Sequence, residues 1–414
     1  MKMRHVRQVL VTFWMVLANL GVWAQQADIS LEYSGNWMGR IPDNTFVAAI
    51  SIPGSHDSST GSGWASGYEE LGEMFARTQD LTFAEQWSIG IRAFDMRPCV
   101  HQDHLNLNHG ICATILRFDE VLFQLRDSLI ANPSEFIIIH LNHETDGDLV
   151  SDPNRAIYNA RIQELLKSDE LKDYMIDFKR TLRLSDVRGK ILVLSRDKYA
   201  SQPVGGFLNN WTGSADWSRR TQVTVTGPGN SSSRTSSIYI QDYWETYEPG
   251  TMDIKLNALL ELLRYGSTHK NRVASSVVWY LNFASAYSKV GVFNASLSEG
   301  YRDNATYTNK AIADYLADES HMAGPTGIIL MDYVGVDESA GYATMGASAV
   351  KAIIANNFKY LEDMGQTSVG QPDSAVKRTL IGTYSITGMK LSTPQPGSIC
   401  IFRYSDGTCQ KVMF

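Results

Sequence analysis

The sequence has 414 residues, of which 37 are Lys or Arg and 44 are Asp or Glu, giving a formal net charge of -7. Because nucleic-acid binding needs clustered positive charge and the charges here form no long runs, the composition argues against a nucleic-acid partner. The length suits one large α/β domain with an appendage, or two domains.

The first residues have the pattern of a secretory signal peptide. Basic residues within positions 2–7 precede an apolar run over 9–23, and Ala24 offers a small residue for cleavage. A transmembrane anchor is the alternative, but Asn19 interrupts the run, which is short for a bilayer. We therefore expect a signal peptide over residues 1–24 and a mature protein that is secreted, periplasmic or attached to the cell surface.

Export would place the cysteines in an oxidising compartment, where disulfides persist. Cys99 lies close in sequence to Cys112, and Cys400 lies close to Cys409, so two local disulfides are one interpretation. Buried free thiols are the alternative, and for the first pair the sequence favours neither.

From residue 28 to about 364 the chain alternates short apolar runs with helical patterns. Strands are expected at 46–52, 89–96, 136–141, 190–194, 237–240, 276–281 and 327–331. Pro53 and Gly54 are expected to end the first strand, so that His56 and Asp57 follow it at once. Helices are expected at 118–129, 154–166, 255–263, 309–316 and 349–361. This alternation predicts a parallel sheet covered by helices, either doubly wound or closed into a barrel.

Polar side chains at the ends of the apolar runs favour the barrel. They are Asp95 and Arg97 at the second run, Asn142 and Glu144 after the third, Arg196 after the fourth, Asp242 after the fifth and Asp332 after the last. A β/α barrel collects its active-site residues at the C-terminal ends of its strands. We therefore expect an α/β fold, a distorted TIM-type β/α barrel over residues 28–364, although salt bridges along one rim could account for some of these residues.

The same residues lie in short motifs of distinctive sequence. The motifs are Ser-Ile-Pro-Gly-Ser-His-Asp-Ser at 51–58, Ile-Arg-Ala-Phe-Asp-Met-Arg at 91–97, Asn-His-Gly at 108–110, Asn-Pro-Ser-Glu-Phe-Ile-Ile-Ile at 132–139, Val-Arg-Gly-Lys-Ile-Leu-Val-Leu-Ser-Arg at 187–196, Ile-Gln-Asp at 240–242 and Leu-Met-Asp-Tyr at 330–333. In order and spacing they resemble the bacterial phosphatidylinositol-specific phospholipase C family, an X-domain type of phosphodiesterase. The resemblance implies an imperfect TIM-type barrel, in agreement with the alternation of strands and helices.

The resemblance implies a secreted lyase that converts phosphatidylinositol to diacylglycerol and a cyclic inositol phosphate. His56 matches the base that activates the inositol 2-hydroxyl, and His109 matches the acid that protonates the departing oxygen. Asp332 matches the carboxylate that orients the base, and Asp57 matches the partner on the acid side.

Arg97 matches the position where the bacterial secreted enzymes carry an arginine and animal relatives hold a calcium ion. A guanidinium provides a permanent charge and a planar fork of donors suited to phosphate oxygens. The resemblance therefore implies catalysis without calcium, another metal or a cofactor.

The resemblance also implies an inositol pocket, and two of its positions depart from the family. Asn142 stands where related enzymes carry a lysine, and Trp244 stands where tyrosine is usual, so the headgroup preference is open. Another inositol phosphodiester, such as a glycosylated anchor, is therefore an alternative substrate. A lipid- or glycan-binding barrel without turnover is a further alternative, although it would not need two proton-transfer histidines. The candidate headgroup contacts are Arg196, Asp242, Glu144, Asn142, Trp244 and Asp95.

The remaining histidines do not form a metal-binding pattern. His101 and His104 are expected in a solvated loop, since their spacing lies outside the usual zinc patterns. His140 and His143 lie at odd spacing in a strand context and are expected to point to opposite faces.

Aromatic residues after the strand ends suggest contact with a phosphatidylinositol-containing membrane surface. Trp64 and Phe293 are the candidates for this membrane rim, with packing beneath their own loops as the alternative. We expect the protein to act there as a monomer.

The C-terminal residues differ in composition from the barrel. Residues 365–378 are predicted to form a linker, and residues 379–414 a small β tail with short strand-like runs and turn signals. The stretch at 382–391 is similar to C-terminal tails of secreted Bacteroidetes proteins, some of which are sorting signals. A sorting or surface-attachment segment is thus one interpretation, and an ordinary β appendage is the other.

Overall fold

The structure is a computed structural model that describes residues 35–144, 154–211, 221–246, 248–268, 276–288, 297–363, 380–385, 390–391, 399–404 and 409–413. The predicted signal peptide and Phe293 lie outside these ranges. The chain divides into two compact units, Met1–Met364 and Gly365–Phe414.

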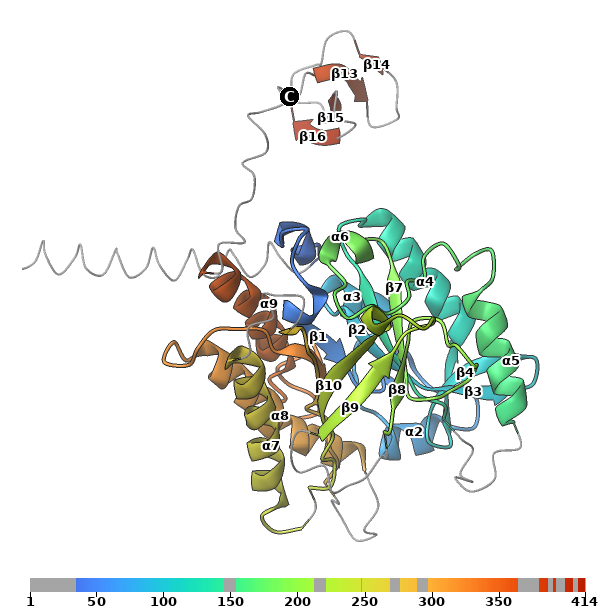
Figure 1. Cartoon of the computed structure of the whole chain (residues 1–414), viewed down its shortest axis with the longest axis vertical. Helices are drawn as coiled ribbons and strands as arrows, with labels where there is room; N and C mark the ends of the chain where they lie inside the picture. The colour runs from blue at the N-terminus through green and yellow to red at the C-terminus, as the bar shows by residue number, and fades with distance from the viewer. Residues whose placement is uncertain are drawn as a thin grey trace, which may run out of the picture. The chain divides into compact units, whose positions relative to one another are not determined.

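A closed barrel forms the centre of the larger unit (Figure 1). Around the barrel the strands are β1 (Ser51–Ser55), β12 (Gly327–Met331), β11 (Trp279–Phe283), β10 (Thr235–Gln241), β9 (Thr221–Thr226), β8 (Gly206–Asn209), β7 (Ile191–Ser195), β6 (Ile137–Leu141) and β2 (Ala93–Met96). Neighbouring strands are parallel except where β9 pairs antiparallel with β8 and β10. The predicted distorted β/α barrel is therefore confirmed.

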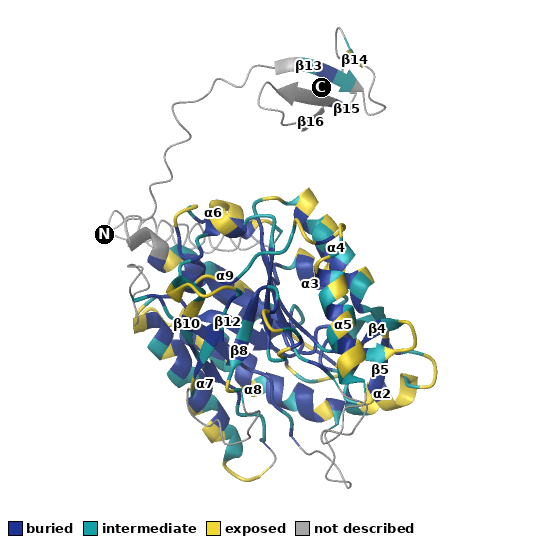
Figure 2. Cartoon of the chain, turned by 45° about the vertical axis from the view of Figure 1, so that its right-hand side comes forward, coloured by how far each residue is buried: buried dark blue, intermediate teal, exposed yellow. Residues whose placement is uncertain are grey.

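Helices surround the barrel, and several of the longer ones bury apolar residues. The helices are α2 (Glu69–Phe75), α3 (Phe83–Ser88), α4 (Phe118–Ala131), α5 (Arg155–Leu166), α6 (Leu184–Val187), α7 (Thr251–Thr268), α8 (Ser298–Ala317) and α9 (Gly346–Asp363). In α4 the buried residues recur at helical spacing from Phe118 to Leu129, as the sequence predicts. Figure 2 shows the result, with buried strands inside and exposed residues on the outer faces of the helices.

The first strand differs from its prediction at both ends. Val47–Ala49 forms a 3-10 turn, and Pro53 and Gly54 lie inside β1 instead of ending it. A Cβ on Gly54 would lie 2.7 Å from Leu330 Cδ2 and 2.8 Å from Ala93 Cβ. Glycine is needed here because β1 packs closely against its two neighbours, and it is therefore not a turn signal.

A small antiparallel sheet follows β2 and was not predicted. It consists of β3 (Pro98–His101), β4 (His104–His109) and β5 (Cys112–Arg117). His101 and His104 therefore lie in strands rather than in a solvated loop. Cys112 is a buried free thiol, so the Cys99–Cys112 disulfide does not form and the alternative applies to Cys112.

The smaller unit contains an antiparallel sheet in the order β14 (Lys390–Leu391), β13 (Leu380–Ser385), β15 (Ile399–Tyr404) and β16 (Cys409–Met413). The side chain of Cys409 is not described, so the second predicted disulfide stays a prediction. Among the described residues, no helix combines the length and apolar character that crossing a membrane requires.

Candidate active site

The polar residues predicted at the strand ends meet at one mouth of the barrel. Parallel strands place their C-terminal ends at the same rim, which is where β/α barrels assemble their active sites. The residues are His56 and Asp57 after β1, Asp95 in β2, Arg97 after β2, Arg196 after β7, Asp242 after β10 and Asp332 after β12.

His56 is held between a carboxylate and a guanidinium. Its Nδ1 lies 2.8 Å from Asp332 Oδ1, and its Nε2 lies 2.8 Å from Arg97 Nη2. Because a guanidinium can only donate, His56 Nε2 accepts this hydrogen bond and Nδ1 carries the ring proton, which it donates to Asp332. Burial and the charge of Arg97 lower the pKa of His56 well below 6.5. His56 is therefore a neutral imidazole with its basic nitrogen at the mouth of the barrel.

Arg97 is surrounded by three carboxylates, of which Asp57 and Asp95 are buried. Its Nε lies 2.9 Å from Asp57 Oδ1, its Nη2 lies 3.0 Å from Asp95 Oδ2, and its Nη1 lies 3.7 Å from Glu144 Oε2. Burial alone would lower the pKa of Arg97, but these carboxylates raise it well above its usual value. The guanidinium thus remains charged in the centre of the site.

Asp95 holds Arg97 in place and, contrary to the sequence-based prediction, does not line the pocket. Its Oδ1 lies 2.6 Å from His140 Nδ1, and its Oδ2 accepts a hydrogen bond from the Asp57 main-chain N–H at 3.1 Å. The side chain is fully buried by these partners. His140 therefore supports the site from behind, whereas His143 packs against Tyr158 with ring centroids 4.0 Å apart, so the two histidines have separate partners.

His109 comes from the small sheet outside the barrel. It ends β4, and its Nδ1 lies 2.7 Å from the carbonyl oxygen of Ala76, the residue after α2. Because a carbonyl only accepts, Nδ1 carries a proton and Nε2 is left for other partners. The Tyr301 hydroxyl of α8 lies 3.5 Å from Nε2, and the rings of His109 and His56 are 6.3 Å apart.

Asp57 lies between the two histidines. Its Oδ2 is 3.2 Å from His56 Nε2 and 3.4 Å from His109 Nε2. Burial raises the pKa of Asp57 to about 8, with Arg97 opposing this shift. Burial and Arg97 lower the pKa of His109 to about 4. Between these values the Asp57–His109 pair holds one proton.

These groups open into a pocket of about 260 Å³. Trp244 stacks on Tyr287 with ring centroids 5.2 Å apart, and the Arg196 guanidinium lies 4.4 Å above the Trp211 ring. Cations, a carboxylate and aromatic faces together suit an anionic ligand rich in hydroxyl groups. The predicted residues that line the pocket are His56, Arg97, His109, Arg196, Asp242 and Trp244.

Glu144 and Asn142 lie beside the pocket, and within the described residues neither belongs to its lining. Burial raises the pKa of Glu144, whereas Arg97 opposes this shift. Asn142 follows β6, and its main-chain N–H donates to the Met96 carbonyl at 3.2 Å.

Trp64 is buried, and this corrects its assignment to an exposed membrane rim. Only 8% of the residue is accessible, and its ring Nε1 donates to Glu73 Oε2 at 3.2 Å. A Cβ on Gly72 of α2 would lie 2.1 Å from a Trp64 ring atom, so the glycine allows the helix to rest on the indole. The alternative, packing beneath its own loop, therefore applies to Trp64.

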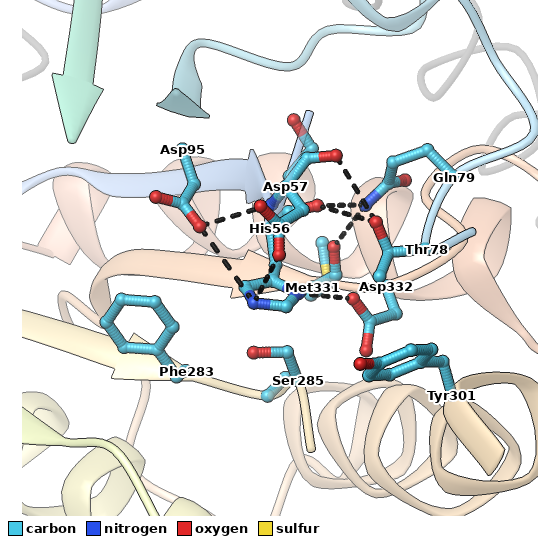
Figure 3. Close-up of polar contacts among 12 residues, drawn as sticks. His56, Asp57, Thr78, Gln79, Asp95, Phe283, Ser285, Tyr301, Met331 and Asp332 are labelled. Atoms are coloured by element: carbon cyan, nitrogen blue, oxygen red, sulfur yellow. Dashed lines mark hydrogen bonds and ion pairs between the residues drawn. The ribbon is translucent and has the colours of Figure 1, made fainter. Parts of the chain in front are cut away.

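Three further pocket residues carry neither a charge at a strand end nor a family motif, so the sequence did not predict them. Phe283 ends β11 and Ser285 follows two residues later, and neither carries a charge. Tyr301 is contributed by a helix instead of a strand. Figure 3 shows these three side chains near His56, across the site from Asp57.

Comparison with known proteins finds similar sequences and structures, although no family model matches the chain. Over 170 residues, 39% of this chain, it is 35% identical to the 1-phosphatidylinositol phosphodiesterase of Listeria monocytogenes, of which the match spans 48%, about half its length. The protein of the same name from Staphylococcus aureus is 24% identical over 326 residues, covering 77% of this chain and 91% of the relative. The predicted family resemblance is thus confirmed.

Solved structures share the fold. A phosphatidylinositol-specific phospholipase C from Staphylococcus aureus superposes with a TM-score of 0.60 at 21% identity, covering 78% of this chain and 98% of the other. The corresponding structure from Listeria monocytogenes gives a TM-score of 0.56 at 24% identity, with the same two coverages. The larger unit therefore has the barrel of these proteins.

Proposed function

We propose that this chain, a homologue of the bacterial phosphatidylinositol-specific phospholipases C, is itself such an enzyme and acts as a phosphatidylinositol diacylglycerol-lyase. The observation that carries the proposal is the pair of histidines that share Asp57 Oδ2, at 3.2 Å and 3.4 Å from their Nε2 atoms. Two imidazoles with different partners, beside a permanent cation, are what an acid-base attack on a phosphodiester requires.

In the first half of the reaction His56 acts as the base. Its neutral Nε2 takes the proton of the inositol 2-hydroxyl as that oxygen forms a bond to phosphorus. The Asp332 carboxylate, 2.8 Å from Nδ1, then stabilises the imidazolium. Before substrate binds, Arg97 donates to Nε2, so the phosphate must draw the guanidinium away and expose the base.

In the second half the bond from phosphorus to the diacylglycerol oxygen breaks, and that oxygen needs a proton. The Asp57–His109 pair supplies it: the proton held by Asp57 passes to His109 Nε2, 3.4 Å from Asp57 Oδ2, and Nε2 donates it to the departing oxygen. The products are diacylglycerol and a cyclic inositol phosphate. His56 later returns its proton, which restores the pair for the next turnover.

Arg97 stabilises the charge that builds up on the phosphate oxygens and takes the place of a metal. His56, Asp57 and Asp95 bring ligand atoms within 4.8 Å of one another, an arrangement that could hold a cation. The Arg97 guanidinium already contacts all three, at 2.8–3.0 Å. The proposed reaction therefore needs no calcium and no other cofactor.

Phosphorus NMR of the purified protein with phosphatidylinositol in mixed micelles, with a chelator present, tests this function. A cyclic phosphate signal is expected from the native protein and not from His56→Ala. A signal that needs added calcium would overturn the role of Arg97. If only a glycosylated inositol anchor is turned over, the substrate is such an anchor and not free phosphatidylinositol. If the lipid is bound but not turned over, the protein is a binding protein.

The candidate contact with the lipid surface is an apolar patch beside His109. Leu71 and Met74 of α2 are 46% and 56% exposed, and Ile111 and Ile115 of the small sheet region are 56% and 58% exposed. We call these four residues the interfacial patch. Exposed apolar side chains of this kind insert into the headgroup region of a bilayer. Export through the N-terminal segment would bring the enzyme to such membranes, where we expect it to act as a monomer.

A further inference from the structure

Lys255 of α7 is a completely buried lysine that belongs to none of the sequence motifs. Its Nζ donates to the main-chain carbonyls of Tyr243 at 2.6 Å, Ser285 at 2.8 Å and Phe283. The side-chain oxygen of Gln241 lies farther away, at 3.4 Å. An ammonium group has three N–H bonds, and here each one has a main-chain acceptor.

The three carbonyls belong to two segments that leave the barrel side by side. One segment follows β10, and the other begins at Phe283, the last residue of β11. The two strands are paired in parallel. A neutral amine could satisfy only two of the three acceptors, so the geometry is built for the charged form. Because a buried cation is costly, an apolar residue would be expected at this position if packing were its only role.

The two segments carry one wall of the pocket. Asp242 and Trp244 come from the first, and Phe283, Ser285 and Tyr287 come from the second. The Tyr287 N–H donates to the Trp244 carbonyl at 3.0 Å, so the segments also bond to each other. Figure 3 shows Phe283 and Ser285 near His56, on the side away from Asp57.

Lys255 also acts on the nearby carboxylates through its charge. Burial raises the pKa of Asp242 and of Asp332, and the ammonium opposes this rise at both. Burial likewise lowers the pKa of Lys255 to about 7, and these same two carboxylates oppose that shift. The cation therefore favours the charged form of the groups on either side of it.

We propose that Lys255 is a positioning residue whose ammonium joins the segments after β10 and β11 and thereby sets the shape of the headgroup wall. It acts on the substrate indirectly, through the wall residues that the two segments carry. The expected change in KM rests on the proposed function. The expected loosening of the two segments rests on the hydrogen bonds of Lys255 alone. Lys255 would thus influence which headgroup the pocket accepts.

The test compares Lys255→Met with Lys359→Met. Lys359 is the matched control because its ammonium also donates to a main-chain carbonyl, that of Leu316, and it lies outside the pocket lining. With phosphatidylinositol in mixed micelles, Lys255→Met is expected to raise KM about tenfold while kcat changes less than about threefold, since a charged hydrogen-bond donor is lost behind the wall. Inhibition by myo-inositol should weaken in proportion.

If Lys255 had only a structural role, Lys255→Met would lower Tm and would not raise KM more than it changes kcat. That result would overturn the proposal. If Lys255→Met does not fold, Lys255→Gln takes its place, because its amide keeps two N–H donors. Hydrogen exchange of the segments around 242–246 and 283–288 is read in parallel and should accelerate in the Lys255 variant alone. If the native protein does not turn over phosphatidylinositol, the proposed function fails, and the exchange result still decides the positioning role.

Discussion

The two candidate catalytic histidines are held in opposite ways. His56 lies at the end of a barrel strand and donates Nδ1–H to a carboxylate, whereas His109 lies on a small outer sheet and donates Nδ1–H to a main-chain carbonyl. A carboxylate stabilises the imidazolium that forms behind it, and a neutral carbonyl fixes the ring without doing so to the same degree. His56 is thus suited to gain a proton and His109 to lose one.

The largest loss of activity is expected when either histidine ring is removed. His56→Ala and His109→Ala should each lower kcat by about 10⁴-fold on phosphatidylinositol, at the upper range for a general acid or base. On an inositol phosphodiester with a nitrophenol leaving group, which departs without a proton, His109→Ala should recover most of its activity. Equal losses for both variants on that substrate would contradict the assignment of base and acid.

The next largest loss is expected when the planar guanidinium of Arg97, which contacts His56, is replaced by an ammonium group. Arg97→Lys should lower kcat/KM by about 10²- to 10³-fold, because an ammonium cannot contact His56, two carboxylates and the phosphate with the same fork. The control is Arg117→Lys, which changes a half-exposed ion pair with Asp119 and should leave kcat/KM unchanged. Full activity of Arg97→Lys in kinetic assays would exclude Arg97 from the mechanism.

A smaller loss is expected when the carboxylate behind His56 is replaced, and little when the residue behind His109 is changed. Asp332→Asn should lower kcat by about 10²-fold, because the amide no longer stabilises the His56 imidazolium. The carbonyl behind His109 belongs to the main chain, so substitution of Ala76 by Ser should leave kcat within about twofold. Similar losses in steady-state assays of the two variants would show that the partners do not differ as the geometry indicates.

Among the described residues the proposed interfacial patch lies on the side of His109, and this predicts an effect on lipid binding. Leu71→Asn with Met74→Asn should weaken binding to phosphatidylinositol vesicles by about tenfold, since two apolar side chains no longer leave water. Turnover of a soluble inositol phosphodiester should be unchanged in the same protein. Unaltered sedimentation with vesicles would eliminate α2 as a membrane contact.

The smallest effect is a shift along the pH axis. Because the pKa of Asp57 is raised to about 8, the acid pair keeps its proton up to that pH and loses it above, so kcat/KM should fall there. Because the pKa of His56 is lowered well below 6.5, the base stays unprotonated in mildly acidic solution and activity should persist. In Asp57→Asn the proton remains only on His109, near its pKa of about 4, so the profile should move toward acid. An unchanged profile would disconnect Asp57 from the acid.

The sequence was most informative where the chemistry is local. A charged residue directly after an apolar strand, such as Asp332 after β12, must lie at the barrel mouth, because strand direction determines where it emerges. For this reason the positions of His56, Arg97 and Asp242 could be predicted without any coordinates. The resemblance to family motifs then suggested a catalytic or binding role for each of these residues, which their spacing in the sequence does not indicate.

The rest depended on contacts between distant parts of the chain. The strand that carries His109 alternates Leu105 and Leu107 with polar residues, a period-two pattern that forms no continuous apolar block and so stands out less than the barrel strands. The burial of Trp64 depends on Gly72, and that of Lys255 on carbonyls about 12 to 30 residues away in the chain. No local pattern records such pairings.

The hydrogen bond between His109 and the Ala76 carbonyl depends on the length of α2 and not on its side chains. Any side chain that keeps the helix intact preserves this main-chain acceptor, so we expect substitutions on the outer face of α2 to leave the position of His109 unchanged. Inserting or deleting a single residue is different, because it turns the end of a helix by about 100° and would carry the carbonyl away from the imidazole. We therefore expect this region to tolerate substitutions better than changes of length.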